Sequence, residues 1–399
     1  MNIFKKLYCR TYQGVFKLML PLLPYREPEI LNDNTEVVVV LKAKGYDKVL
    51  LVTDKGIRGL GLTKALEEEI ERNNISLFVY DGVVPNPTTD NVSEALKVYR
   101  ANGCEALIAV GGGSVMDCAK AVGVKIARPN KSLKQMKGVL KVRKKLPTII
   151  AVPTTAGTGS ETTLAAVITD SETRHKYAIN DFPLIPEFAL LDPNLTVGLP
   201  KHITSTTGMD ALTHAIEAYI GRSTTKQTRA CALSATKAIF ENILEVYNNG
   251  KNIDARRKML KASYEAGLAF TKSYVGYVHA IAHSLGGKYN IAHGLANAII
   301  LPYVLKAFGD KIHNKLWEMG CYSDLFNEQT SIEDGARLFI EKIEELNKEM
   351  GIPTKIEQIR EEDIKELAKT AEHEANPLYP VPVLMTAEEL EKIYYQIKG

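Results

Sequence analysis

The sequence predicts an α/β domain built on a parallel sheet, followed by an all-helical domain. Before residue 195, short β-rich runs alternate with helical stretches: VLLVT (49–53), LFVY (77–80), ALIAV (106–110) and TIIAV (148–152) are the runs. This alternation is typical of strands with helices on both faces of a sheet. Beyond that point such runs nearly vanish, and helical periodicity dominates from Thr204 through Gln396. We therefore expect domains at 1–195 and 196–399.

Length and composition are ordinary for a folded enzyme or binding protein. The chain has 399 residues, 45% hydrophobic and 24% charged, so two or three domains fit. A net charge of +3 is small for this length and indicates no nucleic-acid surface. The five cysteines are scattered without a CxxC pair, as in reduced thiols of a cytoplasmic protein.

Histidines and one aspartate in the second domain suggest a metal site. Asp210 and His214 are four residues apart, as are His279 and His283, and His293 follows shortly after. A four-residue separation places two side chains on one face of a helix, about one turn apart. A carboxylate together with imidazoles suits Zn²⁺ or Fe²⁺ better than Ca²⁺ or Mg²⁺. Singly, each histidine would more often be a core or surface residue, but together they predict one metal centre.

Two glycine- and threonine-rich turns in the first domain suggest a phosphate-binding site. Gly111, Gly112, Gly113 and Ser114 lie between a predicted strand and helix, and PTTAGTGSE (153–161) follows the next strand. Glycine lets backbone N–H groups and a helix N-terminus approach a phosphate closely. Neither turn has the full G-x-G-x-x-G spacing, so a simple tight turn is the alternative.

Asp54 ends the run VLLVTD at the carboxyl edge of the first of these predicted strands. A carboxylate there can accept hydrogen bonds from the adenosine ribose of NAD and would repel the 2′-phosphate of NADP. We therefore expect NAD in preference to NADP, with a turn or helix-cap role for Asp54 as the alternative.

Five segments in this order and spacing closely resemble the iron-containing (group III) alcohol dehydrogenase family. They are GGGSVMDCAK, PTTAGTGSE, DPNLTVGLP, GMDALTHAIEAY and HAIAHSLGGKYNIAHGLANAIILP, and the likeness runs from about Gly45 to the C-terminus. It implies a dinucleotide-binding first domain, a metal-binding second domain, and a homodimer or larger homo-oligomer. The reaction implied is hydride transfer between NAD(H) and a small alcohol or aldehyde.

The resemblance also assigns residues. It implies Fe²⁺, with Zn²⁺ as the alternative, bound by Asp210, His214, His279 and His293. His283 would lie beside substrate and nicotinamide and relay the proton, although a histidine one turn from a ligand can instead only support it. The cofactor-binding residues expected are Asp54, Gly111, Gly112, Gly113, Ser114, Asp117, Thr154, Thr155, Thr158 and Lys176.

Two departures from the family pattern stand out. Ala292 precedes His293 where the family usually has proline, and we expect this to alter the local backbone more than the ligand set. The stretch NPLYPVPVLMT (376–386) replaces a short NPR-type segment, so substrate contacts there do not carry over.

Two other classes of function are worth weighing. A lyase of the dehydroquinate synthase type would share the architecture, but it needs a Lys and Arg cluster around the metal, where this chain offers only Lys272 and Lys288. A non-catalytic scaffold would not need the full ligand and glycine sets.

Residues 1–26 form a separate feature. They carry five Lys or Arg and no Asp or Glu, and their apolar residues recur at helical spacing. Arg10 and Lys17 interrupt the run, which excludes a signal peptide or a membrane span. We expect an amphipathic helix, ended by Pro21 and Pro24, that packs on its own domain or on a partner subunit. Contact with an anionic membrane surface or a protein assembly is the alternative.

Overall fold

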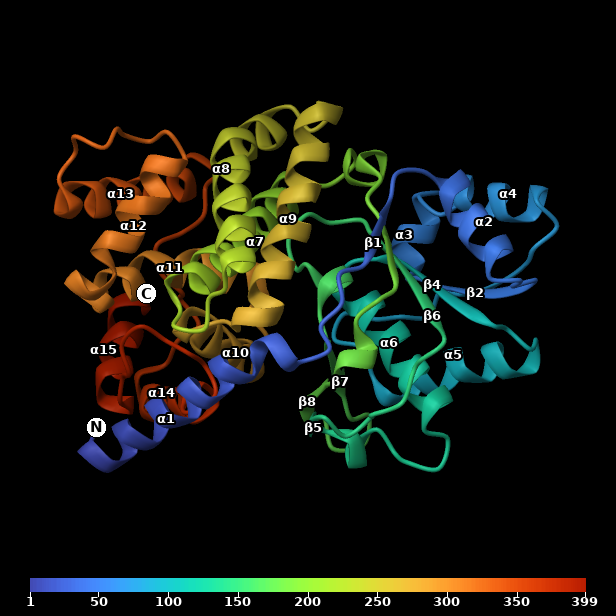
Figure 1. The fold of residues 1–399 in the computed structure, drawn as a ribbon, viewed down its shortest axis with the longest axis horizontal. Coiled ribbons are helices and arrows are strands. Elements are labelled where there is room, and N and C mark those ends of the chain that lie inside the picture. The colour runs from blue at the N-terminus through green and yellow to red at the C-terminus, as the bar shows by residue number, and fades with distance from the viewer. The chain divides into compact units, whose positions relative to one another are not determined.

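The computed structural model describes residues 1–399 and divides them into two compact units (Figure 1). One unit is Pro24–Val197, and the other combines Met1–Leu23 with Gly198–Gly399. The N-terminal helix thus belongs with the helical unit, and not with the α/β domain in which we had placed residues 1–26. The predicted fold class, a parallel α/β domain followed by a helical one, is confirmed.

A six-stranded sheet with the strand order β1-β9-β6-β4-β2-β3 forms the centre of the α/β unit, and all its neighbouring strands pair in parallel. These strands are β1 (Glu29–Leu31), β2 (Lys48–Val52), β3 (Ser76–Tyr80), β4 (Ala106–Gly111), β6 (Thr148–Pro153) and β9 (Phe188–Leu190). The helices of the unit are α2 (Asn34–Ala43), α3 (Lys55–Gly59), α4 (Lys64–Arg72), α5 (Thr89–Ala101) and α6 (Gly113–Ala127).

Both faces of this sheet are buried. Along β2, Leu50 and Val52 belong to a hydrophobic cluster with residues of α5 and α6, whereas Val49 and Leu51 belong to a second cluster with residues of α2 and α4. Successive side chains of a strand point to opposite faces, so a strand covered on both sides reads as an unbroken apolar run. This is why the sequence showed β2, β4 and β6 clearly. The three-residue strands β1 and β9 at the other side of the sheet were not predicted.

A small second sheet was not predicted. It has the order β5-β8-β7 and consists of β5 (Gly138–Val139), β7 (Ala165–Thr169) and β8 (Lys176–Asn180). Only alternate residues of β7 are buried, and the strands are short, so no strong apolar run marks them.

The helical unit is built around a buried helix, α7, in which every residue from Gly208 to Ile220 is buried. The other helices of this part are α8 (Lys226–Asn248), α9 (Ile253–Ser273), α10 (Tyr277–Tyr289), α11 (His293–Phe308), α12 (His313–Tyr322), α13 (Ile332–Glu349), α14 (Glu361–Ala375) and α15 (Ala387–Ile397). Gly208 permits close packing, because a Cβ there would lie 2.8 Å from Ile243 Cδ1 on α8. Polar side chains on α7 are consequently cut off from water and require partners.

The N-terminal helix α1 (Ile3–Met19) ends just before Pro21, as predicted. Its Arg10 guanidinium donates hydrogen bonds to the carbonyls of Val381 and Pro382, and Gln13 Nε2 donates to the carbonyl of Tyr379. These bonds tie α1 to the C-terminal segment and explain its place in the helical unit. No helix of the chain combines the length and apolar character that crossing a bilayer requires.

Candidate metal centre and nucleotide site

Four of the predicted residues converge in the helical unit. Asp210 and His214 come from α7, His279 from α10, and His293 is the first residue of α11. The donor atoms of all four lie within 4.8 Å of one another. Asp210, His214 and His279 are buried, whereas the side chain of His293 is 40% exposed. The exposed side chain of His293 leaves a side from which a small molecule can approach the cluster.

His279 has the chemical state that a metal ligand needs. Its Nδ1 lies 2.6 Å from Glu217 Oε2, whereas its buried Nε2 makes no hydrogen bond and lies 3.9 Å from Asp210 Oδ1. Burial, followed by the neighbouring histidines, lowers the pKa of His279 well below its usual value. A neutral imidazole that donates through Nδ1 directs the lone pair of Nε2 into the cluster, so the residues fit a bound cation.

Glu217 is a residue of this site that the sequence analysis missed. Its carboxylate accepts hydrogen bonds from the backbone N–H groups of Gly276 and Val278, at 2.7 and 2.8 Å, in addition to the bond from His279. Burial raises the pKa of Glu217 to about 7 against the lowering effect of these donors. Gly276 makes the approach possible, since a Cβ there would lie 2.6 Å from Glu217 Oε1. The available signal was an acidic residue three positions after His214, in the otherwise apolar run Ala215–Ile220.

Asn297 is a second such residue. It is fully buried one turn after His293 on α11, and its Nδ2 donates to Asp210 Oδ1 at 2.6 Å. The same nitrogen lies 3.1 Å from His293 Nε2. Asn297 therefore fixes two of the proposed ligands relative to each other. Gly294 allows the two helices to meet, because a Cβ there would overlap the carbonyl of Thr206 on α7.

His283 lies beside the cluster without joining it. Its ring stacks on that of His293, with the centroids 5.1 Å apart and the planes 16° from parallel. Nδ1 of His283 lies 2.6 Å from Glu374 Oε1, and the hydroxyl of Tyr379 donates to the same oxygen at 2.7 Å. With 43% of its side chain exposed, His283 is open to solvent and to small molecules.

The charges in this second group follow from its surroundings. Burial favours a higher pKa for Glu374, but His283 and the hydrogen bond from Tyr379 outweigh it, so the pKa is lowered. Burial and then Glu374 raise the pKa of Tyr379 well above its ordinary value. Glu374 is therefore an anion that receives two donors, and Tyr379 is a neutral phenol. Because Nδ1 is held by Glu374, proton exchange by His283 falls to Nε2.

The two departures from the family pattern can now be placed. Ala292 has a φ of −59°, a value that proline would also adopt. The expected change of the local backbone relative to the family stays a prediction. Tyr379 belongs to the unusual 376–386 stretch, and it reaches Glu374 and so the neighbourhood of His283.

The two predicted glycine- and threonine-rich turns lie next to each other in the α/β unit. Gly111 pairs in register with Pro153, and the Thr154 N–H donates to the Gly111 carbonyl at 3.1 Å. A Cβ on Gly113 would lie 3.3 Å from Thr158, and one on Gly112 would lie 3.7 Å from Thr155. No side chain caps the N-terminus of α6, and the buried Thr154 Oγ1 makes no hydrogen bond. Open backbone donors and an unused hydroxyl fit a phosphate group.

Strand topology agrees with this position. β3 is added on one side of β2, and β4 is added on its other side. The order in which strands are added to the sheet therefore reverses between β2 and β4. Ligands of open parallel sheets bind outside the carboxyl ends of the strands at such a switch point. Gly111–Ser114 and Asp54 occupy those two strand ends. Asp54 is also the N-cap of α3, where its Oδ1 accepts from the Ile57 N–H, so the helix-cap alternative is observed.

Asp117 and Lys176 have protein partners in this unit. Asp117 Oδ1 accepts from Ser160 Oγ and Oδ2 from the Val167 N–H, so its carboxylate anchors the 153–161 loop. Lys176 Nζ donates to Asn86 Oδ1. Their contact with cofactor stays a prediction.

The sequence analysis missed Lys120, which is fully buried and donates to the carbonyls of Ser160, Thr163 and Ala165.

Comparison with known proteins gives the class. Residues 32–193 match the family of iron-containing alcohol dehydrogenases, and residues 204–397 match its C-terminal domain. The 1,3-propanediol dehydrogenase of Citrobacter freundii is 37% identical over 359 residues, which is 89% of this chain and 92% of that protein. The NAD-dependent methanol dehydrogenase of Bacillus methanolicus is 38% identical over 84% of this chain and 88% of its own.

Solved structures agree with this result. A 1,3-propanediol oxidoreductase has a TM-score of 0.89 at 35% identity and covers 94% of this chain and 98% of its own. The sulfoacetaldehyde reductase of Bifidobacterium kashiwanohense, solved in complex with NAD⁺, has a TM-score of 0.83 at 30% identity and covers 94% and 98%. The chain belongs to the iron-containing alcohol dehydrogenase family. It is an oxidoreductase that interconverts alcohols and aldehydes.

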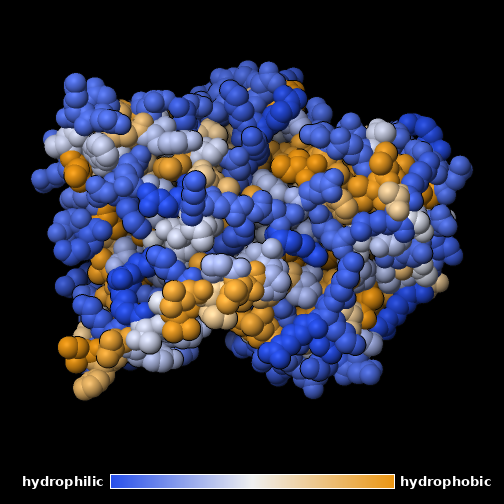
Figure 2. Space-filling model, viewed as in Figure 1, coloured by the Kyte–Doolittle hydropathy of each residue, from blue (hydrophilic) through white to orange (hydrophobic).

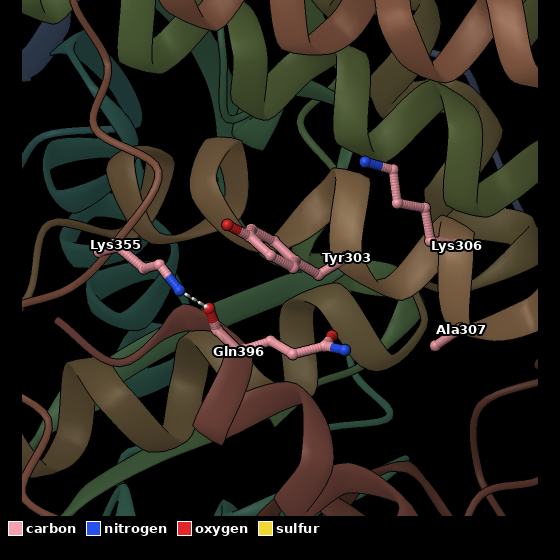
Figure 3. Close-up of a pocket in the computed structure, with 5 residues that line it drawn as sticks. All are labelled: Tyr303, Lys306, Ala307, Lys355 and Gln396. Atoms are coloured by element: carbon pink, nitrogen blue, oxygen red, sulfur yellow. Dashed lines mark hydrogen bonds between the residues drawn. The ribbon is translucent and has the colours of Figure 1, made fainter.

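A surface pocket elsewhere in the helical unit contains none of the residues above. It has a volume of about 380 Å³ and is lined by Tyr303, Lys306, Ala307, Lys355 and Gln396 (Figure 3). Lys355 Nζ donates to the Gln396 carbonyl across it. The pocket has no cluster of metal-binding or acid–base groups, so we assign it no role in the reaction.

Replacing Glu217 with Gln should weaken metal binding about 10- to 100-fold, because an amide cannot accept all three hydrogen bonds that orient His279 and the start of α10. Titration of the metal-free protein with Fe²⁺ or Zn²⁺ measures this. Glu318→Gln is the matched control, since Glu318 accepts a hydrogen bond from Tyr219 of the same helix α7 but is not part of the cluster. Unchanged affinity in Glu217→Gln would show that Glu217 does not position the ligand.

Proposed function

We propose that this protein is an NAD(H)-preferring, Fe²⁺-dependent alcohol dehydrogenase and aldehyde reductase for small alcohols and aldehydes, with Zn²⁺ as the alternative metal. The observation that carries the proposal is the convergence of Asp210, His214, His279 and His293, with donor atoms within 4.8 Å. Two matched relatives are a 1,3-propanediol dehydrogenase and an NAD-dependent methanol dehydrogenase, and these names support the reaction type. A homo-oligomeric state and a cytoplasmic location stay predictions.

The four ligands would hold the cation through one carboxylate oxygen and three imidazole nitrogens. When bound, such a cation acts as a Lewis acid that stabilises negative charge developing on the alcohol or carbonyl oxygen. The chain contributes the orientation of the donors: Glu217 fixes His279, and Asn297 fixes Asp210 and His293. Buried, preorganised donors avoid rearrangement during turnover.

His283 would handle the proton. Carbonyl reduction to an alcohol requires one proton on oxygen, and alcohol oxidation releases one. We assign this proton to Nε2 of His283, because Nδ1 is held by the Glu374 carboxylate. The anionic Glu374 stabilises the charged imidazolium, and Tyr379 holds Glu374 in place. Glu374 and Tyr379 thus act by positioning His283.

The proposed NAD preference rests on the α/β unit. Asp54 lies at the carboxyl end of β2, beside the switch point, where a carboxylate can accept from ribose hydroxyls. Only its Oδ1 is used in capping α3, so the second oxygen can serve such a contact. The Bifidobacterium structure with NAD⁺ supports the same cofactor.

His279→Ala and His283→Ala should have different effects. Loss of His279 should abolish activity together with metal content, whereas His283→Ala should keep the metal and lose about 10²- to 10⁴-fold in kcat, as expected for a missing acid–base group. Metal analysis and NADH-linked assays on anaerobically purified protein measure both. Retention of metal in His279→Ala, with its loss in His283→Ala, would reverse the two roles.

Asp54→Gly should raise the use of NADPH and weaken that of NADH, because the substitution removes the negative charge that repels a 2′-phosphate. The ratio of kcat/KM for the two cofactors measures this. Asp33→Gly is the matched control, since Asp33 also caps a helix of this unit through its side chain. An unmodified enzyme that favours NADPH, or an Asp54→Gly ratio equal to that of Asp33→Gly, would refute this role.

A further inference from the structure

Helix α1 buries one face and leaves the opposite face open. Cys9, Gln13 and Leu20 are buried, and the Phe16 ring packs edge-on against Tyr274 at 5.0 Å. The exposed apolar side chains on and just after the helix are Ile3, Phe4, Leu7, Tyr8, Tyr12, Val15, Leu18, Met19 and Leu22. Phe4 is 80% exposed and Leu18 79%. The hydrophobic patch that they form runs along α1 (Figure 2).

The exposed residues form one stripe along the helix. Phe4, Leu7, Val15, Leu18 and Leu22 recur at spacings of three, four and eight residues, which places them on one side of a helix. Only Thr11 and Gly14 interrupt the stripe, and nothing lies within 4 Å of the position that a Cβ on Gly14 would occupy. Soluble proteins rarely expose so many large apolar side chains together without a binding role.

Positive charge flanks this stripe. Residues 1–26 contain five Lys or Arg and no Asp or Glu. Three of these cations have protein partners: Lys5 pairs with Glu372, and Arg10 and Arg26 donate to backbone carbonyls. Lys6 and Lys17 are exposed on α1 beside the stripe, one near each end of the helix. An apolar stripe with cationic borders is complementary to a surface that is apolar inside and anionic at its rim.

These charges also argue against a second copy of the chain as the occupant. A symmetric pair formed through the α1 stripe would bring two sets of cationic borders together without any acidic residue of the 1–26 segment to offset them. Tyr8 and Tyr12, by contrast, suit the headgroup level of a bilayer, where amphipathic rings concentrate.

We propose that α1 attaches this enzyme peripherally to anionic phospholipid membranes, with the exposed stripe inserted at the headgroup boundary and the flanking lysines at the phosphates. The buried face of α1 keeps its contacts with the C-terminal segment in the bound state. The helix lies along the surface and does not cross the bilayer.

Vesicle flotation with the full-length protein tests this proposal. The probes are phosphatidylcholine vesicles with and without about one third phosphatidylglycerol. We expect binding to the anionic vesicles that falls at least ~10-fold in pure phosphatidylcholine, and that weakens at high salt. A variant with Phe4, Leu7, Val15 and Leu18 all changed to Ser should lose at least ~10-fold in binding while keeping its activity and thermal stability.

Two further variants separate the contributions. Lys6→Glu with Lys17→Glu should reduce binding to anionic vesicles only. Val39→Ser with Leu60→Ser, which removes similarly exposed apolar groups from the α/β unit, should bind like the unmodified protein. Absence of vesicle binding would overturn the proposal. So would concentration-dependent self-association that the four-serine variant abolishes, because the stripe would then be an interface between copies of the chain.

Discussion

The carboxylate of Glu217 is the group on which the proposed metal centre depends. It lies on the buried helix α7 and accepts two backbone N–H groups at the start of α10, which has no side-chain cap of its own. The first N–H groups of a helix have no acceptors within the helix, and the Glu217 carboxylate accepts two of them here. The third bond orients the ring of His279. One buried acid thereby joins two helices and sets the direction of a proposed ligand.

A similar arrangement repeats at the edge of the centre. Glu374 on α14 holds His283 on α10, and Tyr379, from the loop that follows, holds Glu374. The difference lies in solvent access: His279 is buried, whereas His283 is 43% exposed on its side chain. The same carboxylate–imidazole pairing thus gives a fixed, neutral donor in one place and a histidine that can exchange protons in the other.

Sequence alone predicted the features that depend on local patterns. The parallel strands β2, β4 and β6 appeared because both of their faces are buried, whereas the short strands β1 and β9 did not appear. The four metal-binding candidates appeared because two of them are one helical turn apart. Glu217, Asn297 and Glu374 were missed because their roles depend on partners from other elements, such as the 91-residue separation of Glu374 from His283. The position of α1 was misjudged for the same reason, since Arg10 bonds to a carbonyl 371 residues away.

X-ray absorption of the protein reconstituted with Fe²⁺ under anaerobic conditions tests the central claim most directly. The account predicts one iron per chain, bound by light-atom ligands that include the three imidazoles of His214, His279 and His293. The imidazole contribution should fall in His279→Ala. A folded protein that binds no iron, an iron site with sulfur ligands, or a spectrum unchanged by His279→Ala would contradict the account.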